Sequence, residues 1–199
     1  MTSLNFLRIA CVALIGIGLA ACPPVTSKTP VGTTVTAARD PALTGLWRGR
    51  VGDNAASSYF TFFPQDDGSV HVVVVSPPSK DDRGGYGVFA IQAARLGKYR
   101  YLNARQMFDD GKPATGPMAD QTFPVLYRFD DDGALILYIV DETAAKNAVR
   151  AGKIAGTIES GDYGDVVLTA APGALDAFMA SSAGRALFTK PVVILRRVR

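Results

Sequence analysis

Four aspartates in two adjacent pairs are the side chains best suited to catalysis in this chain. Asp81 and Asp82 form one pair, and Asp109 and Asp110 form the other. Two positioned carboxyl groups can act as acid and base in a hydrolysis reaction, so the pairs could serve a hydrolase. Both pairs lie between strand-forming segments, where acidic residues usually only keep a loop solvated. Hydrolysis is therefore the weakest of the functional hypotheses.

Other motifs for catalysis or metal binding are incomplete. His71 is the only histidine, and the Gly-x-Ser-x-Gly elbow that would accompany a serine nucleophile is absent. One histidine is too few for a zinc or copper site. Asp130, Asp131 and Asp132 are consecutive, whereas a calcium loop has acids at alternate positions, so they indicate a turn. We therefore expect no cofactor, no metal and no enzymatic activity.

Arginines in predicted strands are the remaining candidates for ligand binding. Outward-facing arginines would keep a β-rich surface soluble, whereas an inward-facing arginine could hold a carboxylate or phosphate group. Tyr99 and Tyr101 lie on the strand face opposite Arg100, because side chains alternate along a strand. The candidate ligand-binding residues are Arg100, Arg105, Arg128, Tyr99 and Tyr101.

The N-terminal residues have the pattern of an export signal. Arg8 precedes an apolar run from Ile9 to Leu19, which is too short for a comfortable membrane span. The run ends in Leu19-Ala20-Ala21-Cys22, which resembles the lipobox of bacterial lipoproteins. In that class a signal peptidase cuts before the cysteine, which then carries acyl chains. An ordinary signal peptide and an uncleaved anchor are the alternatives.

This resemblance implies a signal peptide at residues 1–21, a lipidated Cys22 and attachment to a membrane. Pro23 follows the cysteine where many inner-membrane lipoproteins have Asp, which favours the periplasmic face of the outer membrane. Removing residues 1–21 takes away one arginine and no acid, so the formal net charge falls from +3 to +2. A charge this small does not indicate nucleic-acid binding, and the one basic cluster, Arg196, Arg197 and Arg199, is typical of a solvated strand end.

The rest of the chain divides into two parts. Residues 22–42 are rich in Pro, Thr and Ala and lack apolar periodicity, which predicts a disordered tether after the lipidated cysteine. Such a tether would reach roughly 25 Å as a coil. Residues 43–199 are long enough for one domain with a real core.

This domain is predicted to be mainly β. Alternating and β-branched segments joined by Gly- and Asp-rich turns give eight to ten antiparallel strands, as an up-and-down barrel or a strongly curved sheet. Four tight hairpins are expected, the last one between 153–159 and 165–170. Two short helices are expected, Glu142 to Ala151 after an Asp141 cap and 172–183 after Pro172.

The connections alternate in length along this predicted sheet. Tight turns alternate with longer segments at 76–85, 105–121, 141–152 and 171–191. Successive connections of an up-and-down sheet lie at opposite ends, so one end should be closed by tight turns and the other crowded with long loops. Long loops on a rigid scaffold usually carry function.

Gly45-Leu46-Trp47 begins the first predicted strand and is similar to the Gly-x-Trp of lipocalins and related barrels. This resemblance implies a lipocalin-like barrel in which an arginine near the C-terminus packs over Trp47. Arg196 or Arg197 could take this place, and Arg196 is the candidate with Gly45 and Trp47.

Three functions from different classes remain. The leading hypothesis is a lipid-anchored protein of the bacterial cell envelope that binds a small amphiphile without catalysis, since an eight-stranded barrel has room for about one small ligand. The alternative is a module that binds or inhibits another envelope protein through its long loops. The hydrolase with loop carboxylates is the third.

Overall fold

The computed structural model describes residues 25–36, 41–51, 56–78, 83–159 and 166–198. The lipobox-like residues and Cys22 lie outside these ranges, as do Asp81 and Asp82. In the described ranges, no helix is both long and apolar enough to span a bilayer.

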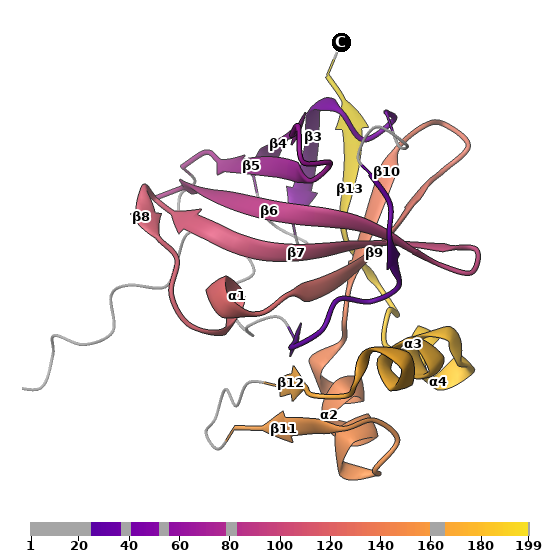
Figure 1. The fold of residues 1–199 in the computed structure, drawn as a ribbon. Coiled ribbons are helices and arrows are strands. Elements are labelled where there is room, and N and C mark those ends of the chain that lie inside the picture. Colours follow the sequence, from indigo (N-terminus) through magenta and orange to yellow (C-terminus); the bar gives the residue numbers. More distant parts are fainter. Residues whose placement is uncertain (1–24, 37–40, 52–55, 79–82, 160–165, 199) are drawn as a thin grey trace, which may run out of the picture.

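Eight antiparallel strands close into an up-and-down barrel (Figure 1). Each barrel strand pairs with the next one along the chain, and the last strand pairs with the first. This confirms the predicted fold class. The barrel strands are β3 (Gly45–Val51), β4 (Ser57–Pro64), β5 (Val70–Ser76), β6 (Gly85–Leu96), β7 (Tyr99–Asp109), β9 (Phe123–Phe129), β10 (Leu135–Ile139) and β13 (Pro191–Arg197).

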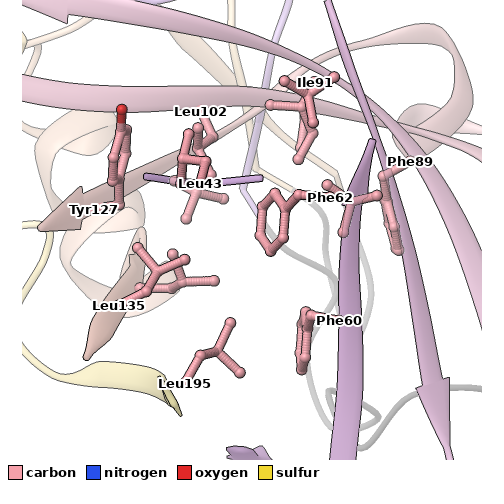
Figure 2. Packing of buried hydrophobic residues seen from close by; sticks show 14 of the residues in the cluster. Leu43, Phe60, Phe62, Phe89, Ile91, Leu102, Tyr127, Leu135 and Leu195 are labelled. Carbon is pink, nitrogen blue, oxygen red and sulfur yellow. The ribbon is translucent and has the colours of Figure 1, made fainter. Parts of the chain in front are cut away.

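Alternation along the strands sorts the side chains into an inner and an outer face. In β5, Val70, Val72 and Val74 are buried, whereas His71 and Val73 are half-buried. The inner residues of all eight strands belong to one apolar core. Figure 2 shows Phe60 and Phe62 projecting into the same interior space as Leu135 and Leu195.

The two ends of the barrel differ as the connection lengths predicted. Tight turns at 65–69, 97–98 and 130–134 join strand pairs at one end, which we call the tight-turn end. Connections at 77–84, 110–122 and 140–190 leave the opposite end, which we call the long-loop end. The connection at 110–122 contains the short strand β8 (Lys112–Pro113) and the single-turn helix α1 (Pro117–Asp120).

The connection at 140–190 forms a lobe outside the barrel. The lobe contains α2 (Glu142–Arg150), β11 (Gly156–Ile158), β12 (Val166–Leu168), α3 (Pro172–Ala180) and α4 (Ser182–Arg185). The hairpin predicted from 153–159 and 165–170 is therefore not part of the barrel, because β11 and β12 pair in a separate three-stranded sheet with β1 (Thr26–Ser27). Local alternation reveals a strand but not the sheet to which it belongs.

Both predicted helices form in this lobe. Asp141 caps α2, since its Oδ1 accepts a hydrogen bond from the Ala144 amide at 2.8 Å. The helix predicted at 172–183 is split at Ser181, whose hydroxyl accepts from the Gly184 amide at 3.1 Å and starts α4. A side chain at position 184 would clash with the Phe178 carbonyl, so the close turn between α3 and α4 requires glycine.

The lobe packs on the outer face of the barrel wall and forms a second apolar core there. Ala94 of β6 and Tyr101 of β7 are 1% and 0% exposed and belong to the same cluster as Leu175, Met179 and Phe188 of the lobe. The apolar residues of the second predicted helix are therefore core residues. Where the lobe covers it, the wall formed by β6 and β7 is therefore apolar on both faces.

Residues 25–36, which we call the strap, lie between the barrel and the lobe. Val25 and Val31 are 2% and 0% exposed. β1 pairs in parallel with β12, Ser27 forms a bridge with Thr122, and β2 (Thr33–Thr34) pairs with the end of β6. The prediction of a disordered tether over 22–42 is wrong for this segment, because its backbone partners lie far away in the sequence.

Two side chains fasten the middle of the strap. The Asn103 amide of β7 accepts from the Val31 N–H at 2.8 Å and donates to the Val31 carbonyl at 3.0 Å. The next strap amide, that of Gly32, donates to Asp176 Oδ1 of α3 at 2.7 Å. Neighbouring strap residues are thus bound to the barrel and to the lobe.

Candidate functional site

An arginine and a tryptophan close the tight-turn end of the barrel. The Arg197 guanidinium lies 4.6 Å from the centre of the Trp47 ring, and it donates hydrogen bonds to the Thr44 and Ala42 carbonyls at 2.6 and 2.5 Å. The Trp47 indole N–H donates to the Leu43 carbonyl at 2.9 Å. Trp47 is 1% exposed, so this end is covered by side chains and by the turn before β3.

Arg197 takes the place that was expected for Arg196. Arg196 is exposed and lies opposite Arg48 in the pairing of β13 with β3, on the outer face. The two arginines face opposite ways because they are adjacent in a strand. Gly45 has φ +118°, and a side chain there would approach Arg197 Nη1 to 2.9 Å, so glycine leaves room for this contact.

The inner face is less completely covered at the long-loop end. Phe60, Phe89 and Phe123 retain 8%, 7% and 9% exposure there. By contrast, Phe62 and Tyr127 near the tight-turn end are 2% and 3% exposed. The Phe89 and Phe123 rings contact each other edge to face, with centroids 5.9 Å apart. The apolar interior is therefore nearest to the surface at the long-loop end.

Polar side chains join this apolar surface at the same end. The hydroxyls of Ser58 and Ser76 lie 3.0 Å apart, on neighbouring strands at positions that alternation assigns to the inner face. Gln106 pairs with Phe89 in the β6–β7 register, so its half-buried amide shares that face. Apolar walls with a few polar groups at one end suit a ligand with an apolar body and a polar head.

Helix α1 covers part of the long-loop end. Its Met118 packs against the barrel core. The helix is held from β7, since Arg105 Nη1 donates to the Ala119 carbonyl at 3.4 Å. The strap holds the residues that follow, because the Thr26 hydroxyl donates to Gln121 Oε1 at 2.6 Å.

Tyr99 and Tyr101 do not line the interior. Both lie on the outer face of β7 and contact the lobe, where the Tyr101 ring lies 5.8 Å from the Phe188 ring. The Tyr101 hydroxyl is buried and has no hydrogen-bond partner among the residues that the structure describes. Burial raises the pKa of Tyr101 to about 12, with a smaller contribution from Tyr99.

The three candidate arginines lie apart. Arg128 points outward, and its Nε donates to the Tyr138 hydroxyl at 3.1 Å, which raises the pKa of the guanidinium. Arg105 also points outward and holds α1. Arg100 lies opposite Tyr127 in the sheet, near the turn between β6 and β7 at the tight-turn end. The five candidate ligand-binding residues therefore form no single site.

The residues considered for catalysis lie on the outer face of the barrel or in its turns and connections. His71 is on the outer face, opposite Phe63 in the sheet. Asp110 accepts from Arg83 at 2.8 Å and from the Tyr86 amide at 2.8 Å. Asp130 binds the backbone of its own turn, at the Asp132 and Ala134 amides. In the described ranges, no three His, Cys, Asp or Glu side chains gather in a way that could hold a metal ion.

Sequence reasoning missed the polar residues of the long-loop end. Ser58 and Ser76 lie near strand ends, where serine is an ordinary residue. Only the pairing register of β4 with β5 brings their hydroxyls together. Gln106 follows Leu102 and Ala104 on the inner face by regular alternation, since the bulge in the β6–β7 pairing lies beyond it. Ser58 is two residues before Phe60, and Ser76 is two residues after Val74. This spacing of two from a large apolar residue is the one sequence signal that could have assigned the serines to the inner face.

Comparison with known proteins gives no relative, since no family model, curated protein or solved structure matches this chain. The functional proposal therefore depends on the residues of this chain.

Proposed function

We propose that this protein is a lipid-anchored, non-enzymatic protein of the bacterial cell envelope whose barrel binds a small amphiphile. The observation that carries the proposal is the apolar inner face, whose buried aromatic side chains at the long-loop end keep 7–9% exposure and lie beside a serine pair and Gln106. An apolar chain would replace water on Phe60, Phe89 and Phe123. A polar head would find hydroxyl and amide partners beside them.

The ligand enters the long-loop half of the barrel only. The other half is occupied by Trp47, Phe129 and Tyr127, whose rings contact one another with centroid distances of 6.1 and 6.2 Å. A short acyl chain or a single small ring system is therefore the size of ligand that we propose, rather than a long lipid.

The anchor in this proposal rests on the apolar run and on Leu19-Ala20-Ala21-Cys22. Three acyl chains on one cysteine would hold a protein in a bilayer far more firmly than the single chain that gives only reversible binding. Intact-mass measurement of protein extracted from membranes tests it directly. We expect a chain that begins at Cys22 and carries lipid mass, and Cys22→Ser should abolish both.

Two glutamine substitutions test ligand binding. The probe is cis-parinaric acid, which fluoresces when it enters an apolar site. Gln106→Trp places a bulky ring on the inner face at the long-loop end, whereas Gln92→Trp places the same ring on the exposed outer face of β6. We expect Gln106→Trp to weaken probe binding by about tenfold or more, which corresponds to about 1.4 kcal/mol, and Gln92→Trp to leave it unchanged.

The two variants differ only in the face that carries the ring. Equal probe affinity in both variants would place the binding site elsewhere. The binding function would be contradicted if the wild-type protein did not bind the probe and native mass spectrometry recovered no bound amphiphile.

A further inference from the structure

The beginning of the strap limits how far the domain can lie from an anchor at Cys22. Val25, Thr26 and Ser27 are 2%, 2% and 1% exposed, and β1 is paired with β12. Three peptide steps separate Cys22 from Val25. A fully extended chain spans at most about 3.6 Å per residue, so Val25 lies within about 11 Å of the Cys22 backbone. The long tether predicted from composition would have allowed more than twice that distance.

The start of the strap lies at the long-loop end. Ser27 forms a bridge with Thr122, which comes directly before β9, and the backbone hydrogen bonds of this bridge are 2.6 and 3.1 Å long. Thr26 binds Gln121 at the end of α1. Figure 1 shows α1 and β8 on one side of the barrel and the tight hairpins on the opposite side. An anchor at Cys22 is therefore close to α1 and far from the tight turns.

Exposed aromatic and aliphatic side chains lie on the outer face at this same end. Tyr59, Val75 and Tyr86 are opposite one another on β4, β5 and β6 and form a row, with exposures of 36%, 43% and 41%. Phe108, 39% exposed, is on the neighbouring strand β7. We call these four residues the rim patch.

The charges beside the rim patch indicate its partner. Arg48 lies opposite Tyr59 on β3 and points outward. Arg50 follows on the same face. Aromatic rings beside cations are the composition of protein surfaces at the membrane interface, where arginines meet anionic headgroups.

We propose that the long-loop end of the barrel faces the bilayer that holds the anchor, with the rim patch seated among the lipid headgroups. This inference rests on the proposed anchor at Cys22, and it adds an orientation to the proposed function. The end of the interior that holds Phe60, Phe89 and Phe123 then faces the membrane, so the bilayer itself is the source of the amphiphile.

Site-specific fluorescence quenching tests this orientation. The mature chain would contain Cys22 as its only native cysteine, consumed by lipid, so an introduced cysteine can be labelled alone. A nitrobenzoxadiazole label is placed at Tyr86→Cys, with Val75→Cys as a second position in the rim patch. Asp132→Cys, on the exposed turn of the tight-turn end, is the matched control. The lipidated protein is reconstituted in vesicles of phosphatidylethanolamine and phosphatidylglycerol with spin-labelled lipid.

We expect the labels at positions 86 and 75 to lose most of their fluorescence to the spin-labelled lipid and the label at 132 to lose none. Inserting a flexible Gly/Ser segment of about 20 residues between Pro24 and Val25 restores a reach of roughly 25 Å and should abolish the difference between the two ends. The insertion leaves the folded domain and the acylated cysteine unchanged.

The outcomes separate the orientation from the anchor. Acylated protein with equal quenching at both ends, or with quenching at position 132 only, overturns the orientation and leaves the anchor intact. Acylated protein without quenching at any position also overturns it and assigns the rim patch to a protein partner. Protein without lipid mass overturns the anchor and the orientation together, whereas probe binding to the barrel is measured independently.

Discussion

The Arg197 guanidinium lies over the Trp47 ring and also binds two carbonyls of the turn before β3, so one side chain joins the last barrel strand to the first. Replacing Arg197 with Ala should lower the free energy of unfolding by about 1–2 kcal/mol, through loss of the cation–π contact and the hydrogen bonds. Arg197→Lys should restore only part of this, because lysine lacks the planar fork. Urea denaturation measures the effect.

Arg196→Ala is the matched control, since Arg196 faces outward on the same strand. We expect a change within about 0.5 kcal/mol. If the Arg196 variant were as destabilised as the Arg197 variant, the closing contact would be assigned to the wrong residue.

Asn103 should control how firmly the strap is held. Asn103→Leu leaves the Val31 N–H and carbonyl without partners between two apolar cores, so we expect a loss of about 2–4 kcal/mol. Hydrogen exchange of the strap amides should rise more than that of β4 and β5. Gln92→Ala removes an exposed amide directly opposite Asn103 and should have little effect. Unchanged exchange of the Val31 amide in Asn103→Leu would contradict this role.

Tyr101→Phe should not destabilise the protein. The Tyr101 hydroxyl is buried without a partner in the described part of the chain, so its removal should leave stability unchanged or raise it by up to about 1 kcal/mol. Tyr59→Phe, at an exposed position, serves as the control. A loss of more than about 1 kcal/mol in Tyr101→Phe would show that the hydroxyl has a partner in solution.

The same residue predicts an alkaline dependence of stability. Burial raises the pKa of Tyr101 from 10.0 to about 12, in surroundings that include Tyr99 of its own strand, Asp176 of α3 and Arg185 of α4. Between these two pH values the unfolded chain has lost a proton that the folded chain keeps, so stability falls as pH rises, by up to about 1.4 kcal/mol per pH unit. Tyr101→Phe should show a shallower decline from pH 10 to 12. Identical slopes in the two proteins would contradict the shift.

Two glycines should respond to alanine in opposite directions. At Gly49 of β3, a side chain would meet the Ile194 carbonyl of β13, so Gly49→Ala should destabilise the seam by about 2 kcal/mol or more. At Gly173 of α3, a side chain meets open space and alanine favours the helix, so Gly173→Ala should stabilise the protein by about 0.5 kcal/mol. Thermal unfolding followed by circular dichroism compares them. Equal midpoints in both variants would contradict the close approach of β3 and β13.

The barrel could be predicted from local signals. Valines at alternate positions in β5 predict a strand, and the Asp-Gly turns at 66–68 and 130–133 predict hairpins. Each of these signals involves residues that are close together in the sequence. The lobe could not be predicted, because β11 and β12 have the same local pattern as barrel strands. Their partner is β1, more than a hundred residues earlier in the chain.

The candidate site shows why single residues are harder to assign than elements. Arg196 and Arg197 have the same side chain, and only the register of β13 against β3 decides which one reaches Trp47. Tyr101 lies on the outer face of β7, which the lobe covers. Because this part of β7 is buried on both faces, its sequence lacks the alternation of apolar and polar residues that would distinguish the inner face from the outer face.

The strap also sets the order in which this molecule can fold. Its Thr29 and Gly32 bind Ala170 and Asp176, which are 141 and 144 residues further along the chain. Contacts between such distant residues form late, because the intervening chain must first be ordered. The residues that are synthesised first are therefore among the last to find their partners. The strap can join the barrel to the lobe only when the lobe is complete.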